Sequence, residues 1–197
     1  LNSKNRKVLE FARSMKKKKK KKYISKIALP KNIRDFKKFE NLVLKVNPKK
    51  WLWNYPIPHG HELIGWKDIK LLLEHIKGSK VDAKGIRFPL CNIEKKYIGK
   101  YMDGCEKCGP HDHLVMGPDS KIHICNSIRN NIGGPKDSFL SLWRNDNTVK
   151  NFRNKNMLPL MCQKCNKVDK CMGGCRFSAL INNGSLEAKH PLAVLRK

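Results

Sequence analysis

The sequence predicts an α/β fold in the first half of the chain, followed by a small, irregular α+β unit that is rich in cysteine. Two observations predict this division. Short β-prone runs alternate with helical periodicity up to about residue 90, and after Cys91 glycine, cysteine, proline and asparagine become frequent while the periodicity fades. We expect a domain boundary near residues 91–104, and we divide the chain into residues 1–23, 24–104 and 105–197.

The first segment, residues 1–23, is predicted to be a basic helix that runs into the lysine run Lys16 to Lys22. The chain has 43 Lys and Arg against 16 Asp and Glu, a formal net charge of +27, and residues 1–50 hold 19 of the basic and three of the acidic residues. A lysine run without interleaved aromatic residues is typical of a solvated segment rather than of a surface that reads bases. We therefore expect neither nucleic acid nor a membrane as a partner, since no apolar run approaches the length of a membrane span.

The middle segment is predicted to follow the order strand, helix, strand, helix, strand. The expected strands are residues 24–29, 51–57 and 86–90, and the expected helices are residues 32–46 and 66–78. Asn32 and Asp35 are spaced as a capping box for the first helix. Trp51 and Trp53 alternate, so both should face the core. This order indicates parallel strands joined by crossover helices, with too few residues for a complete barrel.

The last segment begins with a predicted hairpin. Residues 114–116 and 122–124 are short β-prone runs, and the turn residues 117–120 lie between them. Cys125 follows the second run. Apolar residues at 139–143 predict a short helix farther along.

Cysteines give the densest chemical signal. Four of them form the run Cys162-x2-Cys165-x5-Cys171-x3-Cys175, and the other candidate ligands are Cys105, Cys108 and Cys125. A polar loop of this kind needs a cross-link, and a soft metal bound by thiolates supplies one. Disulfides would need an oxidising compartment, for which no signal peptide is visible. The spacing alone leaves zinc and iron–sulfur open, because Cys-x2-Cys pairs near histidines suit zinc and sets of four thiolates suit a cluster.

The cysteine-rich half resembles the SPASM domain, an iron–sulfur accessory domain of radical S-adenosylmethionine enzymes. The run from Cys162 to Cys175 matches the family pattern at every interval, and Cys171-Met-Gly-Gly-Cys175-Arg176 is similar to its glycine-rich segment. Residues 116–125 resemble its turn-and-cysteine element. The match covers residues 105–193, and it implies that the front half is the last part of a partial TIM-like barrel.

The resemblance also implies cofactors and ligands. A first auxiliary 4Fe–4S cluster would use Cys105 or Cys108, or both, with Cys125 and Cys175. A second would use the remaining members of the run, which are Cys162, Cys165 and Cys171. The full enzyme would cleave S-adenosylmethionine to a radical that abstracts hydrogen from a peptide, a protein or another substrate, and a ferredoxin or flavodoxin would act as its reductant in the cytoplasm.

The chain departs from the family pattern at two positions. Ser120 stands where the hairpin glycine is expected, and Ala193 stands where the family has its last cysteine. The second cluster is therefore left with three evident ligands. The fourth is open between His190, solvent, a substrate group and a cysteine beyond Lys197, and a labile or absent cluster is the other alternative. Cys91 precedes the matched region, and we interpret it as a buried thiol at the end of a strand, since free cysteine is often buried.

The motif that starts radical chemistry in this family, Cys-x3-Cys-x2-Cys, does not occur in this sequence. The first residue is Leu1, so we interpret the chain as the C-terminal part of a longer enzyme, with a truncated gene product as the alternative. A different class of function stays open beside it. The chain would then be a zinc-stabilised basic module that binds RNA or DNA.

Overall fold

A computed structural model of the chain describes residue 14, residues 23–56 and residues 64–193. It divides into two compact units. The sheet unit comprises residues 1–86 and 99–102, and the cysteine unit comprises residues 87–98 and 103–197. The basic helix expected at residues 1–23 falls almost entirely outside the described residues.

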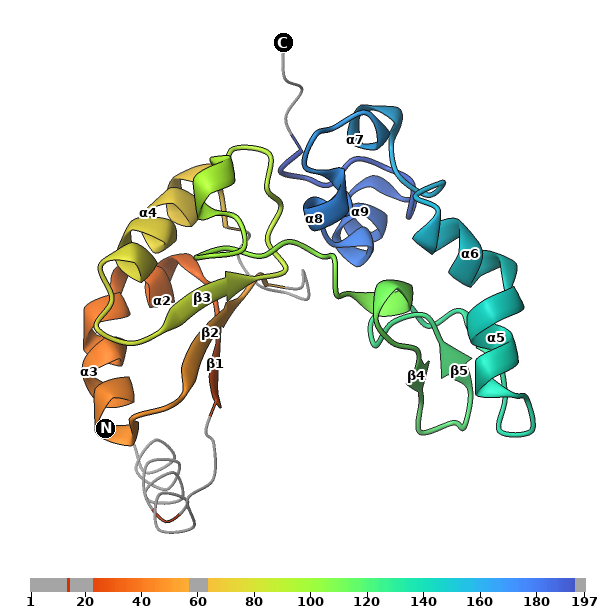
Figure 1. Ribbon diagram of the computed structural model, residues 1–197, viewed down its shortest axis with the longest axis horizontal. Coiled ribbons are helices and arrows are strands. Elements are labelled where there is room, and N and C mark those ends of the chain that lie inside the picture. Colours follow the sequence, from red (N-terminus) through yellow and green to blue (C-terminus); the bar gives the residue numbers. More distant parts are fainter. Residues whose placement is uncertain (1–13, 15–22, 57–63, 194–197) are drawn as a thin grey trace. The chain divides into compact units, whose positions relative to one another are not determined.

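The sheet unit holds three parallel strands in the order β1-β2-β3, connected by helices. Its elements are β1 (Tyr23–Ile27), α2 (Pro30–Arg34), α3 (Phe36–Val46), β2 (Lys50–Asn54), α4 (Trp66–Lys77) and β3 (Ala83–Ile86). Because the strands follow one another in sequence, connections of one hand put the helices on one face of the sheet. Figure 1 shows α2, α3 and α4 on that face. The α/β prediction is confirmed, and the described strands form an open sheet.

Two local predictions in this unit were wrong. Pro30 opens α2, and Asn32 lies inside that helix, where its side-chain amide donates to the carbonyl of Ile27 at 3.1 Å instead of capping. Proline suits the first helical turn because the N–H that it lacks has no partner there. The third strand ends at Ile86, where residues 86–90 were expected to be extended. Pro89, within that expected strand, cannot donate to a sheet ladder.

Aromatic rings form the centre of the sheet unit. The ring centroid of Phe36 lies 4.7 Å from that of Trp51, 5.3 Å from that of Trp53 and 4.9 Å from that of His75. Both tryptophans are buried, which confirms their predicted position. Helices α3 and α4 thus meet on β2 through stacked rings, a contact that adds to the energy of burial itself.

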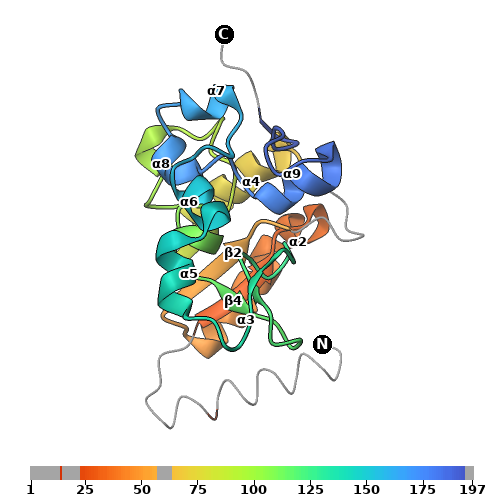
Figure 2. The same cartoon turned by 90° about the vertical axis from the view of Figure 1, so that its right-hand side faces the viewer.

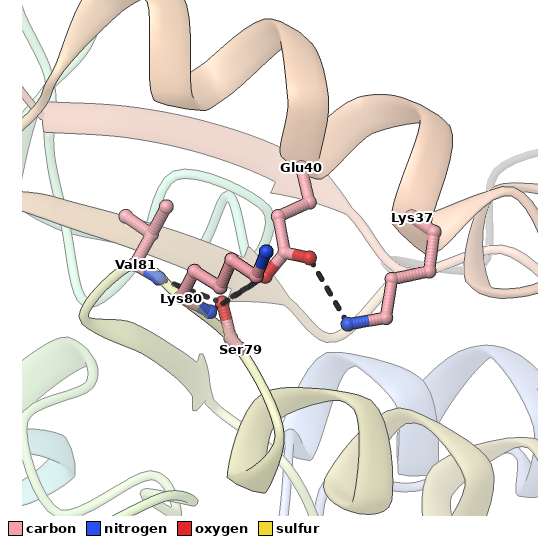
Figure 3. A network of polar contacts seen from close by, with 5 residues as sticks. All are labelled: Lys37, Glu40, Ser79, Lys80 and Val81. Carbon is pink, nitrogen blue, oxygen red and sulfur yellow. Dashed lines mark hydrogen bonds and ion pairs between the residues drawn. The ribbon is translucent and has the colours of Figure 1, made fainter.

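A buried carboxylate ties α3 to the turn before β3 (Figure 3). Glu40 accepts from the Ser79 hydroxyl at 2.7 Å and the Lys80 backbone N–H at 2.8 Å. Its second oxygen accepts from the Lys37 amine at 3.0 Å, and the Val81 N–H donates to the Ser79 hydroxyl at 3.1 Å. These donors satisfy a charge that burial would otherwise penalise.

The cysteine unit begins with a small antiparallel sheet. Its strands are β4 (Val115–Met116), β5 (Ile122–His123) and β6 (Asn131–Gly133). The predicted hairpin is confirmed as β4 and β5, whereas β6 was not predicted. Helix α5 (Phe139–Asn145) confirms the predicted short helix, and α6 (Asn147–Arg153) follows it end to end (Figure 2). Asp146 joins the two and caps α6 by accepting from the Val149 N–H at 3.0 Å.

Three further helices carry the cysteine run: α7 (Leu160–Gln163), α8 (Val168–Cys171) and α9 (Arg176–Asn183). An apolar cluster joins α9 to the small sheet and to α6. Its buried members are Leu114, Ile122, Ile124, Ile128, Val149, Phe152 and Phe177. Within the described ranges, no helix has the length and apolar character needed to cross a membrane.

Candidate metal centre

The eight cysteines, all of them among the described residues, form no disulfide and line two separate cavities of the cysteine unit in groups of four. The larger cavity is lined by Cys91, Cys162, Cys165 and Cys171. The smaller cavity is lined by Cys105, Cys108, Cys125 and Cys175. We call these sets the 91 group and the 105 group. No cysteine belongs to both.

The 91 group surrounds a cavity of about 350 Å³. Cys162 lies on α7 and Cys171 at the end of α8, and both are buried, whereas Cys91 and Cys165 are half-buried. Cys91 does not follow a strand, as the sequence had indicated, but lies in a turn after the sheet unit. Sequence analysis therefore missed Cys91 as a member of this set. The signal that could have pointed to it was the second cluster, which had only three evident thiolate ligands.

A buried lysine holds the turn of Cys91 against the cysteine run. The Lys167 amine donates to the carbonyls of Leu90 at 3.0 Å and Cys91 at 3.1 Å, and also to that of Ile93. Only 5% of Lys167 is exposed. Three carbonyls replace the water around its charge, which is what a buried ammonium needs. Nothing in this lysine-rich sequence distinguishes Lys167 from its neighbours.

Backbone hydrogen bonding and burial set the electrostatics of the 91 group. The Leu90 N–H donates to the Cys171 sulfur at 3.4 Å. Burial, with smaller contributions from the nearby Cys91 and Cys162, raises the pKa of Cys171 to about 11 against the hydrogen bond from Leu90. Burial likewise raises the pKa of Cys162, with Cys91 among the neighbours that add to the rise. Such thiols stay protonated in water but ionise when they bind a metal.

The 105 group surrounds a smaller cavity of about 30 Å³. The Cys105 thiol hydrogen-bonds to Cys108, which lowers the pKa of Cys108 to about 7 while the pKa of Cys105 rises. Burial raises the pKa of Cys175, and the Ser127 N–H donates to the Cys125 sulfur at 3.3 Å. The donors fit a thiolate-bound metal. A four-iron cluster would have to separate Cys105 from Cys108, because the cavity by itself holds only one or two waters.

Glycines allow the cysteine segments to approach one another closely. A Cβ on Gly104 would lie 2.1 Å from the carbonyl oxygen of Lys170. Only glycine therefore lets the segment that contains residue 104 pass beside Cys171. Gly174 has φ of +76°, and its Cβ would lie 2.9 Å from the His190 ring. These two positions explain the need for glycine beside Cys105 and Cys175.

Arg176 is a buried cation beside both groups. Its guanidinium donates to the carbonyls of Leu186 at 3.1 Å and Ala188 at 2.9 Å, and also to that of Gly173. It forms no ion pair with a carboxylate among the described residues. Burial lowers its pKa, while Cys162 and Cys105 are among the sulfurs whose negative charge would raise it. Once a metal ionises these thiols, the thiolates and this cation would stabilise each other.

His190 and Ala193 also line the larger cavity. The Leu192 N–H donates to His190 Nδ1 at 3.1 Å. Burial lowers the pKa of His190 to about 3, with the neighbouring Arg176 adding to the effect, so the ring is neutral. Ala193 offers no donor atom. Of the histidines near the hairpin, His111 lines the smaller cavity, whereas His123 Nδ1 lies 3.0 Å from the Asn130 carbonyl oxygen.

The arrangement of the thiols bears on the kind of metal. Four thiolates on one zinc ion at 2.3 Å lie only about 3.8 Å from one another. No set of three or more His, Cys, Asp or Glu side chains in the described part of the chain converges on one point in this way. The 91 group instead surrounds an open space. This space of about 350 Å³ has room for a polynuclear cluster, whose thiolates lie around a body several atoms across.

The chain was compared with known proteins. No family model matches it, and no curated protein matches it either. The assignment of a function therefore depends on the residues of the two groups.

Proposed function

We propose that this chain binds two auxiliary 4Fe–4S clusters and belongs to a radical S-adenosylmethionine enzyme of the SPASM type. The observation that carries the proposal is the separation of the cysteines into two groups on two cavities. Cys105, Cys108, Cys125 and Cys175 would hold one cluster. Cys162, Cys165 and Cys171 would hold the other. This division is the one that the resemblance implies.

The sheet unit supports the same proposal at the level of fold. Its strands are parallel, sequential in order and covered by helices on one face. A barrel of alternating strands and helices has this singly wound arrangement, whereas a doubly wound sheet reverses its strand order and is covered on both faces. We propose that the sheet unit is the last part of a partial barrel.

Clusters of this type supply electron transfer and structural cross-linking. The chain's own residues would prepare the sites for that role. Arg176 would offset the negative charge of the thiolates, and burial would keep water away from Cys162 and Cys171. The N–H groups of Leu90 and Ser127 donate to Cys171 and Cys125, and hydrogen bonds to sulfur raise the potential of a cluster by stabilising its more negative, reduced form.

The substrate and the radical step belong to the proposal only through the resemblance. They would need S-adenosylmethionine, a reductant and the Cys-x3-Cys-x2-Cys motif, which this sequence lacks. Activity on a peptide or protein would therefore belong to a longer enzyme. The thiols would have to stay reduced, which favours the cytoplasm.

Anaerobic reconstitution of the 197-residue chain with iron and sulfide tests the proposal. The expected product is brown, absorbs broadly near roughly 400 nm and holds about eight iron atoms per chain, four in each cluster. A colourless protein that takes up neither iron nor sulfide would overturn the proposal. Stoichiometric zinc in such a protein, together with steeply salt-dependent binding of RNA or DNA, would favour the basic zinc module instead.

A further inference from the structure

We propose that Cys91 supplies the fourth thiolate of the second cluster, in place of the C-terminal cysteine that Ala193 replaces. This inference rests on the proposed function, since it assigns a ligand to a cluster that the proposed function requires. The thiol of Cys91 would lose its proton to solvent as the sulfur–iron bond forms.

Cys91 lies where a fourth thiolate is needed. Cys91 lines the same cavity as Cys162, Cys165 and Cys171, and these four are the cysteines on its wall. Ala193 lines that cavity too. A thiolate from either Cys91 or a cysteine at position 193 would therefore reach the same space. The chain supplies the sulfur from a segment that precedes the cysteine run instead of one that follows it.

Hydrogen bonds also anchor the turn that contains Cys91. Lys167, which lies between Cys165 and Cys171 in the run, binds the carbonyls of Leu90 and Cys91. The Leu90 N–H in turn donates to the Cys171 sulfur at 3.4 Å. The turn of Cys91 is thus fixed to the loop that carries the other three thiols. A pre-formed site of this kind reduces the ordering cost of ligand binding.

The hydrogen bonding of His190 disfavours the main competitor. Its Nδ1 accepts a hydrogen bond from the Leu192 N–H, so Nδ1 carries no proton. The proton of the neutral ring therefore lies on Nε2, which has no lone pair to offer to iron. His190 is left as a packing residue against Gly174.

Four variants of the full chain test the ligand assignment: Cys91→Ala, Ala193→Cys, the double variant that combines them, and Asn92→Ala as a control in the same turn, where the side chain is exposed. Each is reconstituted anaerobically, oxidised mildly in the presence of a chelator, and analysed for iron and by electron paramagnetic resonance. A cluster held by three thiolates loses one iron or all four under these conditions. A fully ligated cluster resists.

Wild type, Asn92→Ala and Ala193→Cys should each retain about eight iron atoms per chain. Cys91→Ala should retain between about four and seven and should show the resonance of a three-iron cluster if only one iron leaves. The double variant should regain about eight, because its thiolate enters the same cavity. Such rescue separates a ligand from a merely structural residue.

Three outcomes would overturn the assignment. One is a Cys91→Ala chain that matches wild type in iron and spectrum. Another is a loss of iron in Cys91→Ala that Ala193→Cys does not restore, which would give Cys91 a structural role. The third is a wild-type chain with only about four irons, which would leave no second cluster while the first stands. A wild-type chain without iron would instead reject the proposed function itself.

Discussion

The backbone N–H of Leu90 donates a hydrogen bond to the sulfur of Cys171, 81 positions later in the chain. This contact joins the turn that contains Cys91 to the loop that contains the cysteine run. It is reinforced by Lys167, whose amine binds three carbonyls of the same turn. Local structure at the 91 group therefore depends on a few polar contacts that can be removed one at a time.

Replacing Lys167 with methionine should loosen the turn of Cys91. Three carbonyls would lose a charged donor, and the expected cost is on the order of 3 kcal/mol of unfolding free energy. Denaturation of the reconstituted chain measures the cost, and iron analysis should show loss from the second cluster alone. Lys164→Met is the matched control, because Lys164 lines the same cavity but is exposed. Equal stability of the two variants would contradict the anchoring role of Lys167.

Arg176 should tolerate neither methionine nor lysine. Lysine keeps the charge, but its single ammonium cannot occupy the positions of both Nη1, which donates to Leu186 and Ala188, and Nη2, which donates to Gly173, so Arg176→Lys should still lose roughly 2 kcal/mol. Arg176→Met should lose more, since it also removes the cation beside the thiolates. Thermal unfolding of the reconstituted variants provides the measurement. Arg129→Met, at an exposed arginine of the same unit, should change little.

Gly174→Ala should destabilise the cysteine unit more than Gly184→Ala does. Both glycines have φ of +76°, but a Cβ at Gly184 would meet no atom within 4 Å, whereas one at Gly174 would meet the His190 ring. The conformational penalty of about 1 kcal/mol is common to both. Only Gly174→Ala adds a collision next to Cys175. Urea unfolding and iron content measure the difference, and equal losses would show that the His190 contact is unimportant.

Stability of the sheet unit should fall in acid through Glu40. Burial opposes the ionisation of Glu40, but the hydrogen bonds from Ser79, Lys37 and Lys80 outweigh it and lower its pKa. A carboxyl with a lowered pKa in the folded state contributes its full stability above its unfolded pKa of about 4.3. That contribution is lost as the pH falls through the lower, folded value.

Glu40→Gln tests this pH dependence. The variant should be less stable at pH 7 by roughly 1–3 kcal/mol, and the gap should narrow as the pH falls below about 4.3 and through the lower, folded pKa. Unfolding is followed by the fluorescence of Trp51 and Trp53, which are buried in this unit. Glu74→Gln is the control, because its 2.9 Å ion pair with Lys77 is exposed and worth under about 1 kcal/mol. A gap that stays constant at every pH below the unfolded pKa, down to acid unfolding, would assign the effect to packing instead of charge.

Much of the secondary structure could be predicted because its signals are local. The apolar spacing that predicts α3 and α4 lies within single segments, as do the turn residues between β4 and β5. The secondary-structure predictions were wrong where contacts in the folded chain outweigh the preferences of the local sequence. Strand β6 contains Asn131 and Gly133, which have low β-propensity, and it forms because β5 offers a partner. Asn32 likewise bonds to Ile27 instead of capping a helix.

The spacing of the cysteine run, and with it seven of the eight candidate thiol ligands, could be found from the sequence. The order of strands and helices along the first half of the chain could also be predicted, because hydrophobic periodicity and turn residues are properties of short segments. Which thiols share a cavity depends on the folded chain. Cys91 lines the same cavity as Cys162 because the hydrogen bonds of Lys167 and Leu90 bring distant parts of the chain together. Contacts between residues so far apart in the chain cannot be predicted from local sequence patterns.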